Sequence, residues 1–206
     1  MTNEAIGQTV ADLRRDLRMP VDPEQRGPVS LERFFKGMNF GILHTALPKL
    51  SLRVVVEHLI IERWVADPES LGDLASSTDH LDGFLFWSAD VGLAFVDADD
   101  ILARRRFTAA HELGHAVLHR DRMGRYRTDS SIDVTSESVD PIEREANRFA
   151  AELLMPEEVI HARASELKSS YGACPRMVLA YRLASELLVS REAMRYRLKG
   201  LGVGHD

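Results

Sequence analysis

The run His111-Glu112-Leu113-Gly114-His115 is the feature that most constrains how this chain can fold. In an α-helix, residues four apart lie on one face, so His111 and His115 can present two imidazoles to a single metal ion. Glu112 is poorly angled to join them as a ligand, but it can lean over the open side of the metal as a general base. The pattern therefore predicts a helix that carries a hydrolytic zinc site.

The residues around this motif indicate that its helix is buried. Small and apolar residues recur at spacings of three and four, which gives the helix one apolar face. They are Phe107, Ala110, Gly114, Val117 and Leu118. Two histidines beside such a face favour a metal site over a solvated surface helix. Gly114 costs the helix up to about 1 kcal/mol relative to alanine, and a close approach of another element at the metal would explain it.

The motif helix does not supply a complete site, because catalytic zinc normally has three protein ligands. The extended metzincin pattern needs glycine at 118 and histidine at 121, and the chain has Leu118 and Asp121, which excludes that class. His119 lies a turn beyond His115, but three ligands along one straight helix cannot surround a tetrahedral ion. We interpret His119 as a residue at the helix C-terminus, where a partial positive charge suits the helix dipole.

A second helix over residues 140–155 is predicted to supply the third ligand. Asp140 is a good N-cap, Pro141 suits the first helical position, and Pro156 ends the helix. Its apolar stripe comprises Ala146, Phe149, Ala150, Leu153 and Leu154.

Glu143 faces the small-residue side of this second helix and is the favoured third ligand. Asn147, one turn later, is predicted to orient a ligating histidine. Glu145 projects about 200° away from Glu143 and is predicted to be solvated. One alternative stays open, because Asp140-x-x-Glu143 also fits a capping box in which Glu143 folds back onto the helix start.

Two segments resemble the ImmA/IrrE family of zinc metallopeptidases. They are RRFTAAHELGHAVLH at 105–119 and EREANRFAAELLMP at 143–156. The tail, VSREAMRYRLKGLG at 189–202, resembles the C-terminal segment of that family, and the resemblance extends over residues 82–203. It implies that His111, His115 and Glu143 bind Zn²⁺ and that Glu112 is the catalytic base. It also implies cleavage of a partner helix-turn-helix transcriptional repressor, which would regulate a mobile element or a stress response.

The expected fold class is α+β, a zincin-like metallopeptidase domain with a small antiparallel sheet against the active-site helices and an α-helical C-terminal part. Three regions are expected: 1–80, an N-terminal helical or mixed region; 81–160, the zincin-like core; and 161–206, a helical, helix-turn-helix-like segment.

Shorter patterns predict the remaining elements. Residues 83–87 and 91–96 are strand candidates that can form a hairpin. Helix and strand both remain open for residues 52–65. Residues 121–140 are rich in Ser, Thr, Asp and Arg, and we expect a surface loop there that can serve as a lid. An amphipathic helix is expected over residues 5–19 and a mixed, partly helical stretch over 31–47.

Composition narrows the cellular setting. A net charge of −6 argues against strong non-specific binding to nucleic acid. The single cysteine, Cys174, excludes an intramolecular disulfide and fits a reducing cytoplasm. No run of 18 apolar residues and no apolar leader occurs, so we expect neither membrane insertion nor export.

A non-catalytic function is the competing hypothesis, in which metal only stabilises a regulatory protein that acts by docking or by DNA contact. Residues 177–188 and 191–201 form a helix-turn-helix-like pair with a basic second helix, which could enter a major groove. We favour a structural or protein-docking use for it. The other arginines, at 104–106, 120, 122, 125 and 127, are interpreted as solvated charge. An intact Glu112 favours catalysis, because a structural site needs no base.

Overall fold

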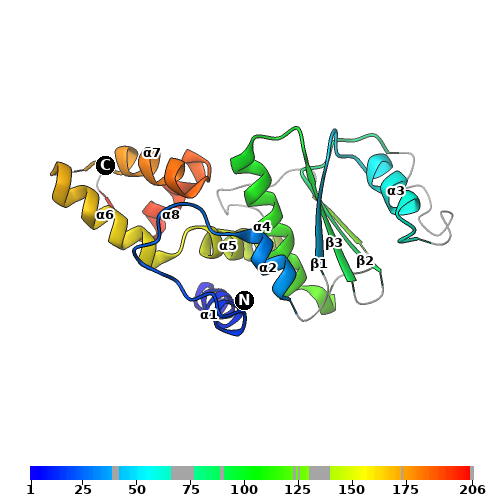
Figure 1. Cartoon of the computed structure of the whole chain (residues 1–206), viewed down its shortest axis with the longest axis horizontal. Helices are drawn as coiled ribbons and strands as arrows, with labels where there is room; N and C mark the ends of the chain where they lie inside the picture. The colour runs from blue at the N-terminus through cyan, green and yellow to red at the C-terminus, as the bar shows by residue number, and fades with distance from the viewer. Residues whose placement is uncertain are drawn as a thin grey trace.

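The computed structural model describes residues 1–38, 42–65, 77–88, 91–122, 124, 126–129, 140–172 and 174–204. A sheet lies at one end of the molecule, the C-terminal helices lie at the other, and α4 and α5 lie between them (Figure 1). The elements are α1 Asn3–Asp16, α2 Leu31–Gly37, β1 Ile42–Leu47, α3 Leu52–Ile61, β2 Gly83–Ser88, β3 Val91–Asp97, α4 Leu102–Leu118, the 3₁₀ turn Arg120–Arg122, β4 Tyr126–Asp129, α5 Pro141–Leu154, α6 Glu157–Tyr171, α7 Arg176–Leu187 and α8 Arg191–Gly200.

The sheet has four strands in the order β1-β3-β2-β4. The predicted hairpin is confirmed, since β2 pairs antiparallel with β3 and Gly83 lies opposite Val96. The short strand β4 pairs antiparallel with the other edge of β2. The expectation of an antiparallel sheet is confirmed for β2, β3 and β4 but is wrong for β1, which pairs parallel with β3. The chain crosses over through α3 between β1 and the hairpin, and such a connection allows a parallel pair.

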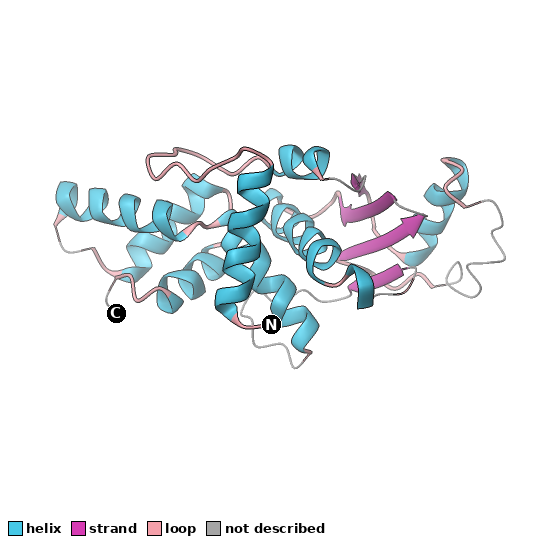
Figure 2. Cartoon of the chain, turned by 90° about the horizontal axis from the view of Figure 1, so that it is seen from below, coloured by secondary structure: helices cyan, strands magenta, loops and turns pink. Residues whose placement is uncertain are grey.

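Helices cover both faces of the sheet, as Figure 1 and Figure 2 show for α3 and α4. Phe84 and Phe86 pack in one apolar cluster with α3, whereas Leu85 and Trp87 pack in a second cluster with α4 and α5. Successive side chains of a strand point to opposite faces, so a strand buried on both faces is continuously apolar. This explains the unbroken run at residues 84–87.

The open alternative at residues 52–65 is settled as a helix for residues 52–61, which form α3. Ser51 caps it, with its Oγ accepting from the backbone N–H of Val54 at 3.4 Å. Val55, Val56 and Leu59 are buried against the sheet. Their spacing of one and four residues places them on one helical stripe.

Three other segments, at the N-terminus, at residues 31–47 and at residues 121–140, also contain defined helices or strands. The expected amphipathic helix at the N-terminus is confirmed as α1, with Ile6 and Val10 buried, and it packs against α5. Residues 31–47 hold the helix α2 and also the edge strand β1. The loop expected at 121–140 is wrong for residues 126–129, which form β4 because the edge of β2 offers them backbone partners. The stretch 130–139 lies outside the described residues.

The C-terminal helix pair is confirmed as α7 and α8, and Ser190 Oγ accepts from the Ala193 N–H at 3.0 Å as its N-cap. Buried Arg197 of α8 donates to Glu152 at 2.9 Å and to the Met155 carbonyl at 3.0 Å, which ties α8 to α5. The expected α+β architecture with a helical C-terminal part is therefore confirmed. None of the described helices has the length and apolar character needed to cross a membrane.

Candidate metal centre

The motif helix α4 is buried from Phe107 through Ala116 and packs closely against α5. A Cβ added at Gly114 would lie 3.2 Å from the Ala146 carbonyl oxygen and 3.1 Å from Phe149 Cδ1. Only a residue without a side chain permits this approach without a shift of α5. The close contact expected at Gly114 is confirmed, and it brings the start of α5 beside the two motif histidines.

The start of α5 has the predicted cap. Asp140 Oδ1 accepts from the Ile142 N–H at 2.9 Å, and Pro141 occupies the first turn. Glu143 follows within that turn, and its Oε2 lies 3.2 Å from His111 Nε2. The carboxylate of Glu143 thus extends toward α4.

Three ligand-type atoms converge between the two helices. His111 Nε2 lies 2.9 Å from His115 Nε2 and 3.2 Å from a Glu143 oxygen, and His115 Nε2 lies 3.5 Å from the other Glu143 oxygen. Two atoms bound to one tetrahedral ion at 2.0–2.1 Å stand about 3.3 Å apart. The three side chains therefore bring their donor atoms to spacings close to those that one tetrahedral ion requires. Two imidazoles and a carboxylate also match the donor set of catalytic zinc.

His111 is held on its other side by α5. Its Nδ1 lies 2.8 Å from Asn147 Oδ1, and both residues are buried. An amide oxygen can only accept, so this contact places the imidazole proton on Nδ1. The lone pair of His111 Nε2 then points toward His115 and Glu143, as metal binding requires.

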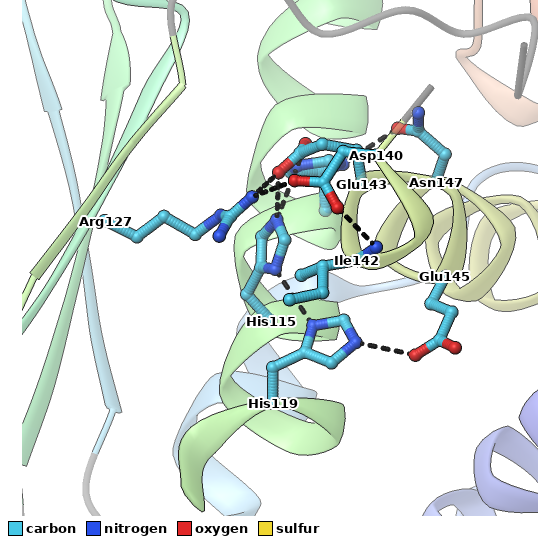
Figure 3. A network of polar contacts seen from close by, with 9 residues as sticks. His115, His119, Arg127, Asp140, Ile142, Glu143, Glu145 and Asn147 are labelled. Atoms are coloured by element: carbon cyan, nitrogen blue, oxygen red, sulfur yellow. Dashed lines mark hydrogen bonds and ion pairs between the residues drawn. The ribbon is translucent and has the colours of Figure 1, made fainter. Parts of the chain in front are cut away.

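His115 is held by a longer chain of contacts. Its Nδ1 lies 3.0 Å from His119 Nδ1, and His119 Nε2 lies 2.9 Å from Glu145 Oε2 (Figure 3). The N-terminal amine of Met1 also donates to Glu145. Burial, together with the charges of the nearby His115, Arg127, Arg122 and His111, lowers the pKa of His119 to about 4. His119 is therefore neutral at pH 7.

The contacts from His115 through His119 to Glu145 correct two interpretations made from the sequence. His119 does cap the C-terminus of α4, but its neutral ring turns into the protein and cannot act as a charge on the helix dipole. The prediction that Glu145 is solvated is wrong, since only 8% of it is exposed. The close contact at Gly114 and Ala146 lets α4 cover both flanks of α5, and Glu145 and Asn147 lie about 100° to either side of Ala146.

Glu112 is fully buried where α4 meets β2. A Cβ added at Gly83 would lie 2.0 Å from Glu112 Oε1 and 3.0 Å from its Cδ. The absence of a side chain at the first residue of β2 is thus what leaves room for the carboxylate. No signal local to Gly83 distinguishes it from an ordinary strand-flanking glycine.

Arg127 of β4 lies on the sheet side of the cluster. Its guanidinium donates to Glu143 Oε1 and lies 3.6 Å from Asp140 Oδ2 (Figure 3). The interpretation of this arginine as solvated charge is wrong, because 22% of its side chain is exposed and it contacts the cluster. Its neighbours in the sequence are equally polar, so only the pairing of β4 with β2 singles it out.

Comparison with known proteins adds two findings. Residues 74–199 match the sequence profile of a peptidase family described as the IrrE N-terminal-like domain. A stretch of 58 residues is 48% identical to "Uncharacterized immunity region protein 2" of Bacillus phage phi105. That stretch covers 28% of this chain and 34% of the phage protein, so the chain spans about a third of that relative's length.

Proposed function

The chain belongs to the ImmA/IrrE family of metallopeptidases, since residues 74–199 match its IrrE N-terminal-like domain. On this basis we propose that the protein is a zinc-dependent endopeptidase that cleaves a helix-turn-helix transcriptional repressor. The observation that carries the proposal is the triangle of ligand-type atoms from His111, His115 and Glu143. Its two histidines lie on α4, a buried helix that also bears Glu112, a group that could act as a base.

In this proposal His111, His115 and Glu143 hold the metal ion. A zinc ion bound there would act as a Lewis acid, which would lower the pKa of a bound water to about 7 and polarise a peptide carbonyl. Arg127 contacts the Glu143 carboxylate, and a guanidinium in this position restrains the orientation of the carboxylate. Asn147 accepts the His111 Nδ1 proton, which keeps the Nε2 lone pair available.

Glu112 moves the proton. Its carboxylate takes a proton from the attacking water and then passes it to the amine of the leaving peptide. The same carboxylate can act in both steps, because the proton that it accepts from water in the first step is the proton that the leaving amine needs in the second. The burial of Glu112 against Gly83 limits the number of positions its oxygens can adopt, and such restriction supports a group that must be placed within about 0.5 Å.

A repressor substrate is supported by two observations. The name of the phage relative places it in an immunity region, which fits a function in repressor-controlled gene expression. Residues 1–100 carry 17 acidic and 9 basic side chains. This negative half can attract a basic DNA-binding domain, and such complementarity raises the association rate and the selectivity. Both partners would then meet in the cytoplasm.

The test is cleavage of a co-encoded helix-turn-helix protein by the purified zinc-loaded chain, with casein as a generic substrate. We expect discrete fragments that separate the DNA-binding part of the repressor from the rest, and weak or no digestion of casein. Mass spectrometry of the fragments identifies the scissile bond. Broad digestion of casein with the repressor intact would overturn the selective role, and no cleavage of either protein would overturn the peptidase assignment.

A further inference from the structure

His119 and Glu145 form a buried chain behind His115 that the chemistry above does not use. The Nδ1 atoms of His115 and His119 are 3.0 Å apart, and His119 Nε2 is 2.9 Å from a Glu145 oxygen. His115 and His119 have no exposed surface. Glu145 reaches this position from α5, on the flank opposite Asn147.

The three groups permit only one consistent placement of protons. A neutral imidazole has one N–H donor and one acceptor nitrogen, whereas an ionised carboxylate only accepts. Glu145 therefore requires the His119 proton on Nε2. His119 Nδ1 is then an acceptor, and the atom that faces it, His115 Nδ1, must carry the proton. The reverse order would turn a lone pair of His119 toward the carboxylate.

This order has a direct consequence at the cluster. With its proton on Nδ1, His115 directs the Nε2 lone pair toward His111 Nε2 and the Glu143 carboxylate, 2.9 Å and 3.5 Å away. Partners on the far nitrogen of a ligating histidine select its tautomer, fix the ring orientation and raise its basicity. His115 thus obtains through two residues what His111 obtains from Asn147 alone.

We propose that His119 and Glu145 are positioning residues that hold His115 in its metal-binding tautomer. The proposal rests on the proposed metal site, and neither residue is a ligand or a catalytic group in it. His119 provides the acceptor that His115 needs, and Glu145 determines which nitrogen of His119 does so.

Two substitutions of His119 separate this role from simple packing. His119→Asn keeps an oxygen near the position of Nδ1, where it can accept from His115, but it is too short to reach Glu145. His119→Gln keeps an amide near the position of Nε2, where it can donate to Glu145, but it has only a methylene near Nδ1. The proposal expects Gln to weaken zinc binding about 10–100-fold and Asn to weaken it clearly less. Packing alone predicts the reverse order, because Gln fills more of the histidine volume.

Zinc dissociation constants of the full chain and both variants are measured by competition with a chromophoric chelator at fixed pH. Long-range ¹⁵N NMR of the zinc-loaded wild-type protein reads the tautomers directly, with His115 expected to be protonated at Nδ1 and His119 at Nε2. If either variant fails to fold, this measurement decides alone. Zinc binding by His119→Gln as tight as wild type, or a His119 protonated at Nδ1, overturns the proposal.

These outcomes are distinct from failure of the proposed function. A wild-type chain that binds no zinc would remove the metallopeptidase proposal itself. A chain that binds zinc and cleaves through Glu112, but is indifferent to His119→Gln, would leave the peptidase intact and remove only the positioning role.

Discussion

Gly83→Ala should inactivate the peptidase without disturbing its metal or its fold. The added Cβ would lie 2.0 Å from Glu112 Oε1, and ordinary contacts begin at 3.4 Å, so this oxygen must retreat by about 1.4 Å (3.4 − 2.0). The Cβ would also lie 3.0 Å from Thr108 Cγ2. The nearest atom is the end of a flexible side chain, so Glu112 moves and the helix and strand stay in place.

The expected magnitude follows from that displacement. A misplacement of about 1 Å in a reacting group can lower the rate about 100-fold, which corresponds to about 2.7 kcal/mol of lost transition-state stabilisation. The free energy of unfolding should change by less than about 1 kcal/mol. The backbone at residue 83 has no positive φ, and alanine at a compatible position stabilises by about 0.4–1 kcal/mol through the unfolded chain.

The assay combines kcat/KM for repressor cleavage with zinc content and thermal unfolding of the same preparations. Gly92→Ala in β3 is the matched control, since its Cβ would meet the Trp87 ring at 3.0 Å and Ile42 Cγ1 at 3.3 Å. That variant should lose about 1–3 kcal/mol of stability through overpacking but cleave normally per zinc-loaded molecule. Wild-type kcat/KM for fully loaded Gly83→Ala would refute the assigned position of the base.

Four further perturbations test the remaining assignments. Glu112→Gln should keep zinc and fold but abolish hydrolysis, and normal cleavage by a pure zinc-loaded variant would remove Glu112 from the mechanism. Glu143→Ala should lower zinc affinity sharply in a metal titration, whereas a mere capping residue would cost about 0.5–2 kcal/mol of stability and leave zinc content intact. A chelator should stop cleavage before circular dichroism reports unfolding, while simultaneous loss would favour a structural metal. Arg197→Ala removes the buried contacts to the Met155 carbonyl and to Glu152, although Glu152 keeps Arg148, and should lower the unfolding free energy in denaturant by about 1–3 kcal/mol; an unchanged midpoint would contradict that.

Local patterns in the sequence determined the helices that matter for the site. Spacing of four residues places His111 and His115 on one face in any α-helix, and the Asp140-Pro141 start is a short-range signal that the structure reproduces. The hairpin of β2 and β3 also follows from two apolar runs separated by a short polar segment. Each of these depends on backbone geometry within a few residues, which is why no partner element was needed to predict it.

Tertiary contact decided which polar groups accompany those histidines. Helical phase alone predicted that Glu145 is exposed to solvent. The close approach of α5 to α4 at Gly114 instead buries Glu145 against His119. Arg127 became a neighbour of Glu143 only because β4 pairs with β2. Gly83 and Glu112, 29 positions apart, meet where the sheet packs on α4. Side-chain periodicity shows which face of an element is apolar. The distance between two elements depends on the residues of both, and that distance determines which polar side chains share a site.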